Sequence, residues 1–360
     1  MKYLQSNSQH KGHFRLFLWP QKFSALALIT MLLFSASFAH YARAGTRSIG
    51  GDFDSFQTAV GAGNDEDALK YANVLYESII AFAKNTQPDE EMASKLSALS
   101  TFFEEKDDYE KAISLGIIAL NFFENTLGTE NPNTVSAINQ LAFLYDAKGN
   151  YAEAEVLLKR ALKIYEKVFG TEHVYTASSL HNLADFHRNL DDFIKAEQFY
   201  RRTLKIYEEI LGPEHTETLT TILELAKLYK QQGNDAGAEE FHKRGLSIRE
   251  KSLGPDHLDT AYSLNALAFI YLELGKYEEA EPLLKRALSI REKKLGPDHP
   301  NTAYSLINLA TLYGDLGKNA EAERLLKDAL VIQEKELGPN HPDTAFTLNK
   351  LAVLYGGLDK

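Results

Sequence analysis

The chain has 360 residues, of which 44% are hydrophobic and 25% charged, as in an ordinary folded protein. It contains no cysteine, which excludes disulfides, thiolate metal sites, a cysteine nucleophile and a lipid anchor on an N-terminal cysteine. A formal net charge of −11 disfavours binding to nucleic acid or to anionic lipid across the whole surface.

Residues 1–44 differ in composition from the rest of the chain. They contain no Asp or Glu, five Lys or Arg, and an apolar run over residues 23–38, followed by small residues at Ala42 and Ala44. This pattern predicts a secretory signal peptide cleaved after Ala44, with a second cleavage point at Ala39. An uncleaved N-terminal membrane anchor is the alternative, because the run approaches spanning length. In either case we expect export from the cytoplasm, to a periplasmic or secreted location if the signal is cleaved.

Removal of this segment makes the protein more acidic. The 39 basic residues lose five, and the remainder stand against 50 acidic residues, which gives a net charge of −16. We attribute most of this acid excess to the solubility of an elongated surface.

Residues 45–85 are predicted to form a short linker and a divergent N-terminal capping repeat. The stretch 45–51 is rich in glycine and predicts the linker. Phe53, Phe56 and Val60 then indicate a shortened first helix, and the apolar spacing over residues 68–79 indicates a second one.

From residue 86 onward one pattern repeats at a fixed interval, and this predicts an array of stacked units. Six full units occupy residues 86–337, and a C-terminal half-repeat, expected to act as a capping helix, occupies residues 338–360. Glycines that end a Leu-Gly or Phe-Gly pair recur 42 residues apart, at Gly128, Gly170, Gly212, Gly254, Gly296 and Gly338.

Each unit predicts two amphipathic helices joined by a tight turn. In the last full unit, residues 306–313 and residues 322–330 carry apolar side chains at helical spacing, with a break at Gly317 between them. Asn301 or Thr302 is expected to cap the first helix, and Pro300 suits its first turn.

The unit carries the signature L-x-x-L-A-x-x-Y, then G, then A-x-x-x-x-x-x-A, which resembles the tetratricopeptide repeat. Its 42-residue length and its LGPDHP connection are similar to the kinesin light chain subclass of that family. The resemblance implies an all-α, right-handed superhelical solenoid of stacked antiparallel helix pairs. It also implies a non-enzymatic scaffold that holds a protein or peptide partner in a concave groove lined by the first helices.

In the kinesin light chain subclass, an L-N-x-L-A segment supplies an Asn that faces the groove and holds an extended peptide by its backbone. Asn139, Asn265 and Asn349 match this position, whereas His181, Leu223 and Ile307 depart from it. Exposed polar Asn residues without a ligand are the alternative reading. Further groove candidates lie one and two turns along the same face: Asp185, Arg188, Lys227, Lys230, Tyr262, Phe269, Tyr304 and Thr311.

Together these residues predict a locally basic centre beside an aromatic wall, suited to an acidic peptide with an aromatic residue. Rotation of the helices by one residue would instead place half of the set on the convex side.

No catalytic, cofactor or metal site is predicted. The H-E-x-x-H, G-x-S-x-G and phosphate-loop patterns are missing. One His recurs at the 42-residue interval in five of the connections, but packed helices lie about 8–10 Å apart, too far for these residues to share one ion. We therefore expect each of them to make a local polar contact; they are His173, His215, His257, His299 and His341.

Two other functions compete with the peptide-binding scaffold. The chain is a self-associating spacer if the half-repeat packs on another copy through Phe346, Leu351 and Leu354, which we expect to be exposed on one side. A hydrolase site hidden in residues 45–85 is the enzymatic alternative, but that stretch is too short for a catalytic domain.

Overall fold

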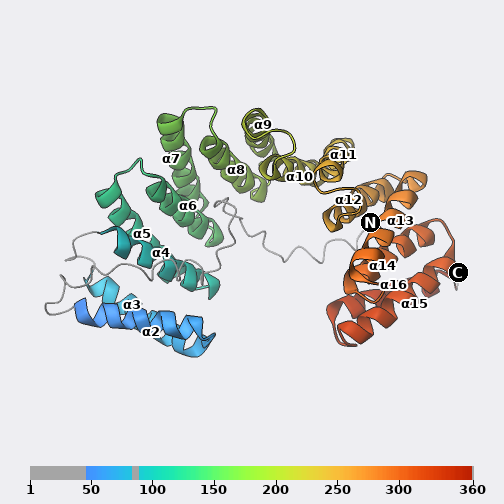
Figure 1. The fold of residues 1–360 in the computed structure, drawn as a ribbon, viewed down its shortest axis with the longest axis horizontal. Coiled ribbons are helices and arrows are strands. Elements are labelled where there is room, and N and C mark those ends of the chain that lie inside the picture. The colour runs from blue at the N-terminus through green and yellow to red at the C-terminus, as the bar shows by residue number, and fades with distance from the viewer. Residues whose placement is uncertain (1–45, 83–88, 359–360) are drawn as a thin grey trace. The chain divides into compact units, whose positions relative to one another are not determined.

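A computed structural model describes residues 46–82 and 89–358, and every regular element in them is an α-helix (Figure 1). Successive helices pack as pairs, which confirms the predicted all-α solenoid of stacked antiparallel helix pairs. The helices are α2 (Thr46–Gly61), α3 (Asp65–Phe82), α4 (Glu90–Glu105), α5 (Tyr109–Leu127), α6 (Pro132–Ala147), α7 (Tyr151–Phe169), α8 (Val174–Asn189), α9 (Phe193–Ile210), α10 (Thr216–Gln231), α11 (Asp235–Ser252), α12 (Leu258–Glu273), α13 (Tyr277–Leu295), α14 (Pro300–Asp315), α15 (Asn319–Glu336) and α16 (Pro342–Leu358).

The chain divides into two compact units. Unit 1 ends at Asp192 and contains α2 to α8, and unit 2 begins at Phe193 and contains α9 to α16. Within each unit, the even-numbered helices from α4 onward are the first helices of the repeats, and the odd-numbered helices from α5 onward are the second helices. The N-terminal pair, α2 and α3, packs in the same way.

A histidine starts most of the first helices. In the connection before α14, the Nδ1 atom of His299 accepts the backbone N–H of Asn301 at 3.0 Å, and Pro300 occupies the first helical turn. The hydroxyl of Thr302 donates to the carbonyl of Gly296 at 2.8 Å. The predicted local role of the recurring His is therefore confirmed, but the cap is His299 and neither Asn301 nor Thr302. The ring nitrogen satisfies an N–H that would otherwise lack an acceptor.

In the turn between the two helices of each pair, one residue has a left-handed backbone conformation. This explains why glycine recurs at that position. Gly317 has a φ of +70°, and glycines occupy the same register in most of the other turns. Asp107 and Asp191 take this position in two turns, with φ values of +59° and +58°. Asp adopts this conformation more readily than most residues, so these two turns keep the same backbone shape without glycine.

Alanines recur at one buried position of the second helices, where the sequence predicted close packing between helices. They are fully or almost fully buried, which lets neighbouring backbones approach: Ala154, Ala196, Ala238, Ala280 and Ala322.

Two expectations about the ends of the array are wrong. Helix α2 begins at Thr46, so most of the glycine-rich stretch 45–51 is helical and is not a linker. The buried side chains of Phe53 and Phe56 stabilise the middle of α2. The helix then extends back through the glycines, because adding a residue to an existing helix costs less than starting one.

At the C-terminal end, Leu351 is buried and Leu354 is partly buried, contrary to the expectation that they are exposed. They pack on the preceding helix. The exposed apolar side chains of α16 are instead Phe346, Leu348, Val353 and Tyr355.

The predicted signal or anchor segment, residues 1–44, lies outside the described residues. Among the residues that the structure describes, no helix combines the length and the apolar character needed to cross a bilayer.

Candidate first-helix binding faces

The predicted Asn position falls on the first helices but differs in exposure from repeat to repeat. On α6, Asn139 is buried and its Oδ1 atom has no hydrogen-bond partner. On α12, Asn265 is also buried, whereas Asn349 on α16 is exposed. The two apolar substitutes behave as packing residues, since Ile307 is buried and Leu223 is half-buried.

In unit 1 the predicted groove residues of α8 contact one another. The imidazole of His181 lies 3.6 Å from the carboxylate of Asp185, and the guanidinium of Arg188 lies 3.5 Å from the same carboxylate. Both His181 and Asp185 are buried. These three side chains therefore form a polar cluster on α8.

The same face of unit 1 carries two partly buried acids one repeat apart. Burial, and secondly the charge of Glu105, raise the pKa of Glu104 to about 7. Burial likewise raises the pKa of Asp146 to about 6. Both residues occupy the register of Arg188, so this position changes from acidic to basic along the array.

In unit 2 the predicted basic centre is balanced by carboxylates. The ammonium group of Lys227 lies 2.6 Å from Glu224. Lys230 lies 2.9 Å from Asp235 and also pairs with Glu273. Burial opposes the charged form of Lys230, but hydrogen bonds to these two carboxylates outweigh that effect and raise its pKa.

The aromatic residues that were predicted to form a wall lie on α12 and α14 in unit 2. Tyr262, Phe269 and Tyr304 each expose about half of their side-chain surface. The two tyrosines sit beside cations, because the guanidinium of Arg249 lies 5.7 Å from the ring centre of Tyr262, and that of Arg291 lies 5.6 Å from the ring centre of Tyr304.

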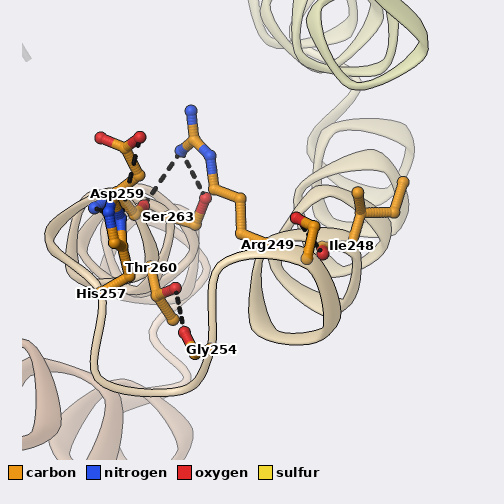
Figure 2. Close-up of polar contacts among 8 residues, drawn as sticks. Ile248, Arg249, Gly254, His257, Asp259, Thr260 and Ser263 are labelled. Carbon is orange, nitrogen blue, oxygen red and sulfur yellow. Dashed lines mark hydrogen bonds and ion pairs between the residues drawn. The ribbon is translucent and has the colours of Figure 1, made fainter. Parts of the chain in front are cut away.

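These two arginines belong to the second helices, and the sequence analysis missed them. The Nη1 atom of Arg249 donates to the Ser263 hydroxyl at 2.7 Å and to the carbonyl of Asp259 at 3.1 Å (Figure 2). Figure 2 also shows His257, which caps the start of α12, and Thr260 in the first turn of that helix, whose hydroxyl donates to the carbonyl of Gly254 in the connection.

Arg291 repeats this arrangement one unit later. Its Nη1 atom donates to the Ser305 hydroxyl at 2.7 Å and to the carbonyl of Asn301 at 3.2 Å. With the amide oxygen of Asn265 turned toward the guanidinium, that oxygen accepts from both Nη atoms, at 2.9 and 3.1 Å. The predicted groove Asn is thus held by a residue of the neighbouring helix.

Neither guanidinium forms an ion pair within 4 Å among the described residues. Burial lowers the pKa of Arg249, with Asp259 and Tyr262 acting in the opposite direction from longer range. Burial also lowers the pKa of Arg291, opposed by Tyr304. Both side chains remain cations at neutral pH, because arginine does not deprotonate in proteins. The surface of unit 2 around Tyr262 and Tyr304 therefore contains two partly desolvated guanidinium cations. Among the described residues, their hydrogen-bond acceptors are all neutral polar groups.

His242, on α11, is also affected by the positive charge of Arg249. Burial, followed by the charges of Lys227 and Arg249, lowers its pKa to about 4, so it is neutral at pH 7. Its buried Nδ1 atom has no hydrogen-bond partner.

The two arginines can be recognised in the sequence because the residue type changes at their position in the repeat. The equivalent residues are Tyr165 and Tyr207 in the earlier repeats and Gln333 in the last one. Comparison of second helices as well as first helices would have found the change. No group of three or more His, Cys, Asp or Glu side chains in the described residues is arranged to hold a metal ion.

Comparison with known families identifies the repeat. A family model described as tetratricopeptide repeat matches residues 91–167, 175–251, 236–293, 259–335 and 314–360. No curated protein matches the chain.

Solved structures include similar chains. A Podosopora anserina protein assigned as a kinesin light chain, with nearly identical TPR-like repeats, is 30% identical with a TM-score of 0.51, over 57% of this chain and 98% of that one. BtubC (BKLC) from P. vanneervenii is 25% identical with a TM-score of 0.50, over 71% and 93% of the two chains. A Pyrococcus horikoshii signal transduction ATPase with a tetratricopeptide repeat sensor is 17% identical with a TM-score of 0.56, over 86% and 43%, and shares the fold alone.

Proposed function

Since this chain belongs to the tetratricopeptide repeat family, with repeats of the kinesin light chain type, we propose that it is a non-enzymatic scaffold that binds a protein or peptide on the first-helix face of unit 2. Tetratricopeptide repeats typically mediate protein–protein interaction, and stacked repeats offer an extended surface for it.

The observation that carries this proposal is the pair of partly desolvated guanidiniums. A charge removed from water is costly unless an opposite charge and hydrogen bonds compensate for it. Arg291 bonds only neutral oxygens of Asn301, Ser305 and Asn265, and Arg249 bonds only neutral oxygens of Asp259 and Ser263. A carboxylate of a bound peptide supplies the missing opposite charge, and this favours an acidic ligand.

The neighbouring groups suit the rest of such a peptide. With its oxygen engaged by Arg291, the Asn265 side chain keeps its NH₂ group to donate to a peptide carbonyl. The half-exposed rings of Tyr262, Phe269 and Tyr304 offer contact area for an apolar or aromatic side chain. The proposed ligand is an extended acidic segment with an aromatic anchor.

A peptide-library selection tests this function. Wild-type protein is expected to enrich Asp and Glu next to an aromatic residue. The double variant Arg249→Gln/Arg291→Gln should lose the acidic enrichment and at least about tenfold in affinity for selected peptides, because each charge-assisted bond contributes about 1.5–3 kcal/mol.

Arg286→Gln is the matched control for this selection. Arg286 lies on α13 together with Arg291 but already pairs with Glu250 at 2.5 Å. The control should therefore select the same peptides as wild type. Equal enrichment of acidic peptides by the double variant would place the binding surface elsewhere and contradict the proposal.

We also propose that the protein is exported. The support is the basic, apolar and small-residue order of residues 1–44. Mass spectrometry of protein expressed in a secreting host should find a mature N-terminus at Gly45, or at His40 if cleavage follows Ala39. Retention of residues 23–38 in a membrane fraction would support the anchor instead, and full-length protein left in the cytosol would contradict export.

A further inference from the structure

Three half-exposed aromatic residues occupy one position of three successive first helices. They are Tyr262 on α12, Tyr304 on α14 and Phe346 on α16, each 42 residues after the one before, and we name them the aromatic row. Their exposed fractions are 59%, 52% and 50%. Tyr262 and Tyr304 keep this exposure although neighbouring helices pack on both sides of α12 and of α14. The exposure of the row therefore does not come from the end of the array.

Tyrosine occupies the row wherever the preceding second helix carries a buried arginine. Arg249 precedes Tyr262, and Arg291 precedes Tyr304. Where the preceding second helix carries a tyrosine instead, the row position is a small hydroxyl residue, such as Ser178 on α8. Each guanidinium lies over its tyrosine ring, 5.7 Å and 5.6 Å from the ring centre. The cation holds the ring from one side, and the rest of the ring surface is available to a ligand.

The spacing of the aromatic row selects the backbone conformation of a ligand that contacts successive rings. Helices α12 and α14 contact each other directly, and packed helices lie about 8–10 Å apart. In a polyproline II segment, residues three apart share one side and lie about 9.3 Å apart, since each residue rises about 3.1 Å. In a β-strand, residues two apart share a side at about 6.6 Å, and residues four apart at about 13 Å. Of these two extended conformations, polyproline II matches the row.

The polar groups beside the row suit a segment rich in proline. Proline has a carbonyl but no N–H, so the backbone of such a segment mainly accepts hydrogen bonds. The exposed tyrosines supply hydroxyl donors, and Asn265, whose oxygen accepts from Arg291, supplies an NH₂ donor. The two guanidiniums call for carboxylates close to the rings. Charge complementarity therefore places acidic residues between the prolines.

We propose that the aromatic row binds a polyproline II segment with proline at every third position and Asp or Glu between the prolines. This inference rests on the proposed function, because it specifies the conformation and the proline content of the acidic ligand assigned to the same face. Each proline packs on one exposed ring, as proline-rich segments dock in aromatic-lined grooves. Such a segment loses little conformational entropy on binding. Phe269, two turns further along α12, contacts the aromatic side chain of the ligand.

Three synthetic peptides of equal length test the spacing with the full chain. The first has prolines three apart, in the sequence G-P-E-A-P-E-A-P-E-Y-G. The second has the same composition with prolines two apart, G-P-E-P-A-P-E-A-E-Y-G, and the third has alanine in place of each proline, G-A-E-A-A-E-A-A-E-Y-G. Titration calorimetry should show that the first peptide binds at least about fivefold more tightly than the other two.

Tyr304→Ser tests the ring itself, because serine stands at this position in an earlier repeat, as Ser178. The variant should bind the first peptide at least about fivefold more weakly and should lose the preference for it over the second. Tyr151→Ser is the matched control, since Tyr151 is 47% exposed on α7 in unit 1, and it should bind as wild type does. Circular dichroism should show unchanged helicity in both variants, because both side chains are half-exposed.

The outcomes separate this inference from the proposed function. Equal affinity for the first and third peptides, lost for both in Arg249→Gln/Arg291→Gln, would overturn the polyproline II segment and leave the acidic-peptide function intact. Tighter binding of the second peptide would indicate an extended strand and overturn the inference. Wild-type affinity of Tyr304→Ser would place the proline contacts away from the row and overturn it too. Absence of binding for all three peptides, with no acidic enrichment in the library selection, would overturn both proposals.

Discussion

Burial sets the charge state of individual side chains in these repeats. Glu104 is the clearest case, because burial of its carboxyl raises its pKa to about 7. His242 shows the opposite direction for a base, since burial and neighbouring cations lower its pKa to about 4. Both shifts favour the neutral form of the group, as desolvation requires.

The Glu104 shift predicts a dependence of stability on pH. Its folded pKa lies above the ordinary Glu value of 4.5, so its contribution to stability is complete below pH 4.5 and is lost as the pH rises through 7. Glu104→Gln keeps the side chain neutral and should raise the free energy of unfolding by roughly 1–2 kcal/mol at pH 8, but hardly at pH 4.5, after allowance for partial exposure.

Urea unfolding at the two pH values measures this difference. Glu105→Gln removes only the neighbouring charge and should give a smaller gain at pH 8. Equal stabilisation by Glu104→Gln at both pH values would show that ionisation of this carboxyl is not the cause.

At the scale of the helix pair, the connections decide where each first helix begins. The LGPDHP segment supplies a glycine with positive φ and a histidine that accepts the N–H two residues later, and the threonine that follows the segment donates back to the glycine carbonyl. Because all three contacts are local, they recur wherever the residues recur. Sequence could therefore predict the positions of these helices to within a few residues.

Replacing each of two glycines in one repeat by alanine should change the stability of the protein in opposite directions. Gly296 has a φ of +93°, so Gly296→Ala should destabilise by about 1–3 kcal/mol although a Cβ atom there would meet nothing within 4 Å. Gly314 lies inside α14, also with open space around a Cβ atom, and Gly314→Ala should stabilise by about 0.5–1 kcal/mol. Thermal unfolding followed by circular dichroism compares them, and destabilisation by both would refute the conformational explanation.

At the scale of the whole molecule, the helices within each of the two units pack mainly on helices next to them in sequence. Stability in such an array is close to a sum of repeat and neighbour contributions, so damage should remain local. The binding surface is likewise a sum of local contributions, because each repeat adds its own exposed residues. This explains how unit 2 gains arginines at a register where unit 1 has Tyr165.

A core truncation should show this locality. Phe103 is fully buried in unit 1, and Phe103→Ala should cost about 3–5 kcal/mol. Amide hydrogen exchange should accelerate in α3 to α6 and remain unchanged in α14 and α15. Phe346→Ala, at a half-exposed site, should leave exchange in both regions unchanged. Uniform acceleration throughout the chain after Phe103→Ala would mean that the array unfolds as one cooperative body.

The repeat length, the order of helices, the buried alanines and the local polar contact of the recurring histidines could be predicted from the sequence alone, whereas the capping role of those histidines could not. The predictable features follow from contacts within one unit or between adjacent units, and a fixed period reveals them. Tertiary structure decided what each polar side chain contacts. It showed that Lys227 and Lys230 are balanced by carboxylates and that Arg291 holds Asn265. These outcomes depend on distances between residues 3 to 43 positions apart, and periodicity cannot specify them.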